Sequence, residues 1–135
     1  MKKVMIFGTF DGLHEGHRAF LKEASDQGDY LIAVVAQDHI VQHIKGHLPQ
    51  LNLAERFDHL KKEDEVDEVV IGDSKSGTWG VLKKYKPDII ALGYDQGVLR
   101  QDLEANLKEL DWQPIIKIMP AYEPSKYHSS KINKQ

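Results

Sequence analysis

Short apolar runs alternate with amphipathic stretches along this chain, and that order leaves few folds open to it. Residues 30–36 form a nearly continuous apolar run. Such a run is typical of a strand that is buried on both faces of a parallel sheet. Four other runs are similar, so the expected strands are residues 4–7, 30–36, 66–71, 88–93 and 115–119.

Helices are expected between these runs. Asp38 and Asn52 stand where the N-caps of two helices are expected. Gly28 is expected to close the first helix. The predicted helices are residues 17–27, 39–45, 53–63, 78–85 and 98–110.

The alternation of strands and helices predicts an α/β fold. We expect a single domain over residues 1–135. It should be a Rossmann-like, doubly wound, mainly parallel five-stranded sheet with helices on both faces. In such sheets ligands bind at the carboxyl ends of the strands, near the point where the strand order reverses.

The segment at residues 8–17, Gly-Thr-Phe-Asp-Gly-Leu-His-Glu-Gly-His, lies at such a strand end. His14 and His17 would stand where a helix begins, and free N–H groups and the helix dipole favour anions there. Gly16 lacks the Cβ that would obstruct a closely approaching phosphate. With a nucleoside triphosphate at this place, the two imidazoles would stabilise the charge that grows as pyrophosphate leaves.

Two other interpretations of the histidine pair stay open at this point. A His-x-x-His pair is also found as half of a metal site, and it also occurs as two surface histidines in a loop. The chain has no cysteine, and its other histidines form no second pair at a familiar zinc spacing. We therefore expect no protein metal site.

Composition excludes several classes of protein. With 41% hydrophobic and 29% charged residues, the 135-residue chain is neither disordered nor fibrous. Its net charge of −3 gives no case for nonspecific binding of nucleic acid. No run is long and apolar enough for a membrane span, and the lack of cysteine fits a reducing compartment, so we expect a cytoplasmic protein without membrane partners.

Polar residues follow most of the predicted strands, and the fold would bring them to one crevice. Singly, each group also fits a turn or a solvated helix end. After the first, second and fourth strands the polar and glycine residues are Thr9, Asp11, Gln37, Asp38, Lys45, Gly93, Tyr94, Asp95 and Gln96.

The string at residues 8–17 resembles the signature of the cytidylyltransferase-like nucleotidylyltransferases. That family includes glycerol-3-phosphate cytidylyltransferases, phosphopantetheine adenylyltransferases and archaeal-type FAD synthases. The resemblance implies catalytic roles for His14, His17 and Lys45. It implies that the nucleotide is bound by Gly8, Thr9, Phe10, Gly16, Arg56, Gly93, Asp95, Gln96, Lys126, Ser129 and Ser130, with Arg56 in a supporting role.

One departure from the family pattern indicates which branch of the family this chain resembles. Cytidylyltransferases commonly have an arginine several residues before the terminal motif that Ser129, Ser130 and Lys131 resemble. This chain has no arginine after Arg100, and Lys126 is the nearby cation. A lysine is a point charge and lacks the bidentate fork of arginine. The departure and the Gly-Tyr-Asp-Gln string at 93–96 favour the FAD synthase-like branch over the glycerol-3-phosphate branch.

The resemblance therefore implies transfer of a nucleoside monophosphate from ATP or CTP to a small phosphorylated acceptor, with release of pyrophosphate. FMN with ATP is the pair that we favour, and Mg²⁺ is the expected cofactor. The family often forms dimers, so a homodimer is possible on this basis. The alternatives are a glycerol-3-phosphate-type cytidylyltransferase, a nucleotide-binding regulatory module without turnover, and a flavodoxin-like binding protein, which would lack the paired histidines.

The polar tail at residues 125–132 is expected to close over the triphosphate when nucleotide binds.

Overall fold

The structure, a computed structural model, describes residues 1–75 and 77–120. Its centre is a five-stranded sheet with the order β3-β2-β1-β4-β5, whose four strand pairs are all parallel. The α/β fold predicted from the alternating pattern is confirmed. The elements in chain order are β1 (Lys3–Gly8), α1 (Glu15–Ser25), β2 (Tyr30–Val35), α2 (Asp38–Lys45), α3 (Leu53–Lys61), β3 (Glu68–Ile71), α4 (Gly80–Tyr85), β4 (Ile89–Leu92), α5 (Gly97–Asn106), a 3₁₀ turn (Leu107–Glu109) and β5 (Ile115–Ile118).

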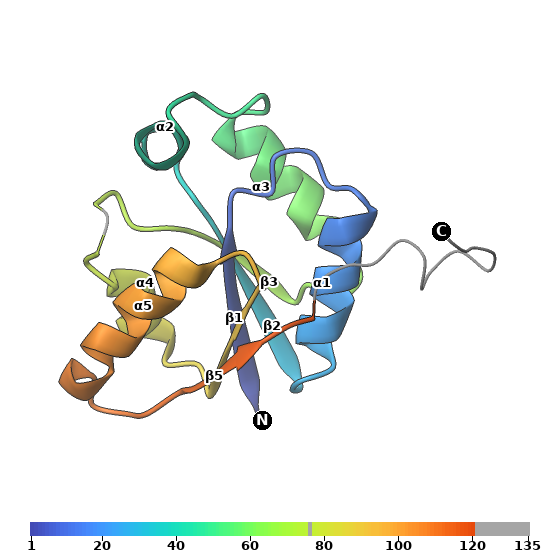
Figure 1. Cartoon of the computed structure of the whole chain (residues 1–135). Coiled ribbons are helices and arrows are strands. Elements are labelled where there is room, and N and C mark those ends of the chain that lie inside the picture. Colours follow the sequence, from blue (N-terminus) through green and yellow to red (C-terminus); the bar gives the residue numbers. More distant parts are fainter. Residues whose placement is uncertain (76, 121–135) are drawn as a thin grey trace, which may run out of the picture.

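Helices cover both faces of the sheet. Figure 1 shows α1 and α3 on one side and α4 and α5 on the other, with α2 beyond the carboxyl ends of the strands. Leu21 of α1 and Leu60 of α3 are buried in one core cluster, whereas Leu82 of α4 and Leu103 of α5 are buried in the other. The near-continuous apolar character of β2 follows, because successive side chains of that strand enter opposite clusters.

The strand order reverses at β1. The chain runs outward from β1 through β2 to β3, and then returns to the other side of β1 with β4 and β5. β1 pairs with β2 over six residue pairs, from Lys3 with Tyr30 to Gly8 with Val35. Its pairing with β4 covers only Val4 with Ile89 and Met5 with Ile90. The reversal point that binds ligands in such sheets therefore lies between β1 and β4.

Several element boundaries differ from the sequence prediction. α1 begins at Glu15, two residues before the expected start, because His14 caps it. It ends at Ser25, so Gly28 does not close it. Gly28 is instead required by close packing, since a Cβ there would lie 2.8 Å from the Lys2 carbonyl oxygen.

Of the two expected N-caps, one is confirmed. The Asn52 side chain accepts a hydrogen bond from the Glu55 amide and caps α3. Asp38 is the first residue of α2 rather than its cap, and its carboxylate pairs with Arg56. α4 begins only at Gly80, because Trp79 before it has a left-handed backbone.

Candidate functional site

His14 and His17 are held together by the first turn of α1. His14 is the N-cap, and its Nδ1 accepts a hydrogen bond from the Gly16 amide at 3.0 Å. Nδ1 of His17 accepts from the His14 amide at 3.3 Å. The two rings lie 3.9 Å apart between centroids, inclined at 32°. The pair thus forms a capping box in which histidines take the places usual for serine and glutamate.

This arrangement fixes the tautomer of both rings. Each Nδ1 accepts an amide proton, so a neutral ring carries its own proton on Nε2. Burial and the charge of His14 lower the pKa of His17 below its ordinary value of 6.5, so His17 is mainly neutral at pH 7. The site therefore presents Nε2–H donors beside the N-terminus of a helix, an arrangement suited to a phosphate.

The turn between β1 and α1 is compact because an aromatic ring fills it. Phe10 is buried and has a left-handed backbone with φ of 53°, which is uncommon outside glycine. A Cβ on Gly8 would lie 2.8 Å from the Phe10 ring, so Gly8 makes room for that ring. Phe10 also packs beside His17, with centroids 6.1 Å apart. These two residues, expected to bind nucleotide, shape the loop that presents the histidines.

Asp11 connects this loop to the start of α3. Its two carboxylate oxygens accept hydrogen bonds from the amides of Gln50 and Leu51, each at 2.8 Å. Burial alone would raise the pKa of the Asp11 carboxyl, but these donors and the charges of Arg56 and Lys45 lower it overall from 3.8. Asp11 therefore braces the turn.

Arg56 is fully buried and bonds to four protein acceptors. Its guanidinium donates to the carbonyl of Thr9 at 2.9 Å and to that of Ala36 at 2.7 Å, which follow β1 and β2. It also donates to the carbonyl of Leu51 and to the Asp38 carboxylate. Arg56 therefore joins the segments that follow β1 and β2 to α2 and to the segment before α3. With no exposed surface it makes no direct phosphate contact in this conformation.

Two charged residues act on His17 from other segments. Lys45, at the exposed end of α2, lowers the pKa of His17, and Asp95, after β4, raises it. Both effects are smaller than those of burial and His14. The charge of Lys45 also acts on Asp11. His14 and His17 follow β1, Lys45 ends the helix that follows β2, and Asp95 follows β4, so all four lie beyond the carboxyl ends of the strands.

Gly93 and Gln96 form a tight turn after β4. The Gln96 carboxamide accepts from the Gly93 amide and donates to the Phe7 carbonyl, both at 2.8 Å. Gly16 lies in the first turn of α1, and Thr9 is half-buried beside Phe10. Lys126, Ser129 and Ser130 lie outside the described residues, as does the tail at 125–132.

Trp79 has an unusual backbone conformation and an unusual indole environment, neither of which the sequence predicts. It has a left-handed backbone, with φ of 56°, and its ring packs edge-on against Phe7 at the carboxyl end of β1. Its indole N–H is buried and has no hydrogen-bond partner in the part of the chain that the structure describes. By contrast, the indole N–H of Trp112 donates to the Pro87 carbonyl.

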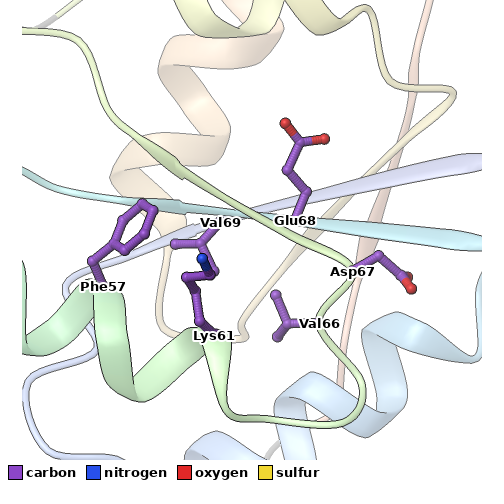
Figure 2. Close-up of a pocket in the computed structure, with 6 residues that line it drawn as sticks. All are labelled: Phe57, Lys61, Val66, Asp67, Glu68 and Val69. Carbon is purple, nitrogen blue, oxygen red and sulfur yellow. The ribbon is translucent and has the colours of Figure 1, made fainter.

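Two cavities lie away from the histidines, between α3 and the edge strand β3. Figure 2 shows the first, of about 260 Å³, where Phe57 and Lys61 face the segment with Val66, Asp67 and Val69. The second, of about 440 Å³, adjoins it along Leu53, Phe57 and Ile71. Neither is lined by His14 or His17.

Over residues 1–75 and 77–120, no group of three or more His, Asp or Glu side chains is placed to hold a metal ion. Within the same ranges no helix is long and apolar enough to cross a membrane.

Comparisons with known proteins agree with this geometry. A family model described as cytidylyltransferase-like matches residues 5–135. A FAD synthase of Thermococcus sibiricus is 40% identical over 131 residues, which cover 96% of this chain and 88% of that protein. A FAD synthase of Pyrococcus horikoshii is 40% identical over 132 residues, with the same shares of the two chains covered.

Two solved structures are also similar to this chain. The crystal structure of a lipopolysaccharide core biosynthesis protein from Thermoplasma volcanium matches with a TM-score of 0.84 and 32% identity, over 91% of this chain and 99% of that one. A pantoate-beta-alanine ligase from Francisella tularensis matches with a TM-score of 0.62 at 15% identity, over 92% of this chain and 61% of that one. The second likeness concerns the fold alone.

Proposed function

The chain belongs to the cytidylyltransferase-like family of nucleotidyltransferases, and from that premise we propose that it transfers the adenylyl group of ATP to FMN. The products are FAD and pyrophosphate. FMN and ATP are chosen because the similar proteins from Thermococcus and Pyrococcus are named FAD synthases. The single observation in this chain that carries the chemistry is the histidine capping box at the start of α1.

The reaction needs no covalent enzyme intermediate. A phosphate oxygen of FMN attacks the α-phosphorus of ATP in line, and the bond from that phosphorus to the bridging oxygen breaks. Charge then grows on the departing pyrophosphate. Enzymes of phosphoryl and nucleotidyl transfer act mainly by positioning the reactants and by stabilising this charge.

We assign the charge stabilisation to His14, His17 and Lys45. The Nε2–H donors of the two rings are already oriented by the capping box, so little reorganisation is needed during the reaction. Lys45 adds a positive charge that already acts on His17. Lys126, Ser129 and Ser130, which lie outside the described residues, are proposed to hold the β- and γ-phosphates with backbone amides of their segment.

Mg²⁺ fits this site as a partner of the nucleotide rather than of the protein. Both carboxylate oxygens of Asp11 are engaged by backbone amides, and the described residues offer no cluster of three acidic or histidine ligands. A Mg²⁺ ion held by phosphate oxygens and water needs few protein ligands and would neutralise triphosphate charge. A homodimer and a cytoplasmic location are likewise proposed on the sequence and its resemblance alone.

The test is a pyrophosphate-release assay with Mg²⁺, in which ATP or CTP is combined with FMN, glycerol 3-phosphate or phosphopantetheine. We expect release with ATP and FMN, together with FAD identified by chromatography. The matched control is the double variant His14→Ala, His17→Ala, which should show no release above background. Turnover of CTP with glycerol 3-phosphate, and none of ATP with FMN, would overturn the proposed substrates.

A further inference from the structure

Gln96 is the residue before α5, but its side chain does not cap that helix. The helix begins with a backbone hydrogen bond from the Arg100 amide to the Gln96 carbonyl. The carboxamide turns back to the sheet instead. Its Oε1 accepts from the Gly93 amide and its Nε2 donates to the Phe7 carbonyl, both at 2.8 Å. Gln96 thus occupies an N-cap position, but its side chain bonds to the ends of two strands instead of to the helix.

The two groups that Gln96 joins belong to the ends of β1 and β4. The ladder between these strands stops at Met5 with Ile90, although β1 continues to Gly8 and β4 to Leu92. On the other side of β1 the ladder with β2 reaches Gly8, and the Ala36 amide then donates to the Gly8 carbonyl. β1 and β4 therefore separate toward their carboxyl ends, whereas β1 and β2 stay paired. There Gln96 bridges two backbone groups through its side chain.

This bridge also fixes the turn that carries Asp95. The Gln96 amide donates to the Gly93 carbonyl at 3.1 Å, so residues 93 and 96 are joined by two reciprocal hydrogen bonds. A Cβ on Gly93 would lie 2.9 Å from a carboxylate oxygen of Asp95, which shows how tightly the turn is folded. The bridge therefore holds this turn at a fixed position relative to β1.

We propose that Gln96 is a positioning residue, which sets the separation of β1 and β4 at their carboxyl ends and thereby the fit of the nucleoside part of the triphosphate. The inference rests on the proposed function, since it takes a nucleotide to be the ligand at the point of strand reversal. A carboxamide is required because one atom must accept and the other must donate. A carboxylate of the same size accepts only, and it would face the Phe7 carbonyl with a negative charge.

The experiment compares Gln96→Glu with Gln113→Glu in the full chain. Gln113 is the matched control, because its Nε2 also donates to backbone carbonyls, those of Leu107 and Trp112, far from the histidines. Dissociation constants for ATP are measured by calorimetry, and kcat and KM by pyrophosphate release. For Gln96→Glu we expect the Kd and KM for ATP to rise about tenfold or more, the effect of losing one hydrogen bond to a partly buried group. At saturating ATP we expect kcat to change by less than about threefold, since the histidines are held by a separate capping box.

Unchanged ATP affinity in Gln96→Glu, or an equal rise in KM for Gln113→Glu, would overturn the inference. A fall in kcat with KM unchanged would also overturn it. Gln96→Met, which keeps the length without charge, provides a second variant if the glutamate variant does not fold; the same rise in Kd is expected. Wild-type protein that binds ATP but releases no pyrophosphate with FMN would contradict the proposed reaction, while the comparison of affinities would still decide the role of Gln96.

Discussion

At the scale of single residues, the two imidazoles at the start of α1 are the centre of the site. The Nδ1 atom of each ring accepts from a backbone amide, and a backbone hydrogen bond with Gly12 also acts on the pKa of His17. Because Nε2 takes no part in the cap, the capping role and the chemical role of a ring can be separated by mutation. An asparagine side chain places its oxygen near the position of Nδ1 and has nothing at the position of Nε2, so it preserves the cap and removes the outward donor.

We predict that His17→Ala lowers kcat by about 10²-fold or more, because the loss of one preorganised donor to a developing charge has an effect of that order. His17→Asn should lower kcat by a similar factor while changing the melting temperature less than His17→Ala does. Steady-state pyrophosphate release and thermal unfolding measure the two effects. Wild-type turnover in either variant would show that the Nε2 donor of His17 is not used.

His17 should also make stability depend on pH. Burial, aided by the charge of His14, lowers the pKa of this ring in the folded protein below 6.5, so the unfolded chain takes up a proton at higher pH than the folded one. The contribution of neutral His17 to stability is therefore complete above about 6.5 and is lost as the pH falls through the lowered value. Urea unfolding of wild type and His17→Asn between pH 8 and pH 4 measures it. The wild-type advantage should shrink on acidification; a constant difference would contradict the shift.

At the scale of elements, Arg56 joins the segments that follow β1 and β2 to α2 and α3. We predict that Arg56→Lys destabilises the protein by about 2–4 kcal/mol, because buried carbonyls and the Asp38 carboxylate lose donors that a single ammonium cannot replace. The control is Arg100→Lys, in an exposed pair with Glu104, which should change stability by less than about 0.5 kcal/mol. Urea unfolding compares the two, and equal effects would refute the role of Arg56.

The elements themselves were largely predictable, and the exceptions have physical causes. Apolar runs predict strands well in a sheet that is covered on both faces, and the five strands are where such runs occur. The start of α1 was wrong by two residues, since capping by an imidazole nitrogen has no strong sequence signal. The role of Asp38 was wrong because its partner, Arg56, is 18 residues away in the chain. Contacts between distant segments are not visible in a local pattern.

The same limit applies to the site. A strand followed by glycines and paired histidines predicts a site at the carboxyl ends of the strands, because the fold class alone brings strand ends together. It did not predict that Phe10 fills the turn over Gly8, that Arg56 is fully buried, or that Gln96 bridges two strands. Each of these depends on the strand order and on packing across the sheet, which one sequence does not specify.

At the scale of the whole molecule, the five strands all precede residue 120. We predict that a chain cut before residue 125 keeps a folded sheet but loses nucleotide turnover, because the removed residues include Lys126, Ser129 and Ser130. Circular dichroism tests the fold, and pyrophosphate release tests the activity. Full turnover by the shortened chain would remove the tail from the proposed site.

The central position of β1 in the sheet has a consequence for folding during synthesis on the ribosome. The first strand to be synthesised is the middle strand of the sheet. At its amino end, the Lys2 amide donates to the carboxylate of Asp29, which lies 27 residues further along the chain. The Lys3 amide donates to the carboxylate of Asp88, which lies 85 residues further along. Three strands can therefore assemble while the last two are still being translated, and until then one side of β1 has an unpaired, aggregation-prone edge. The seam between β1 and β4, which forms only after β4 has been made, is the one that is proposed to hold the nucleotide.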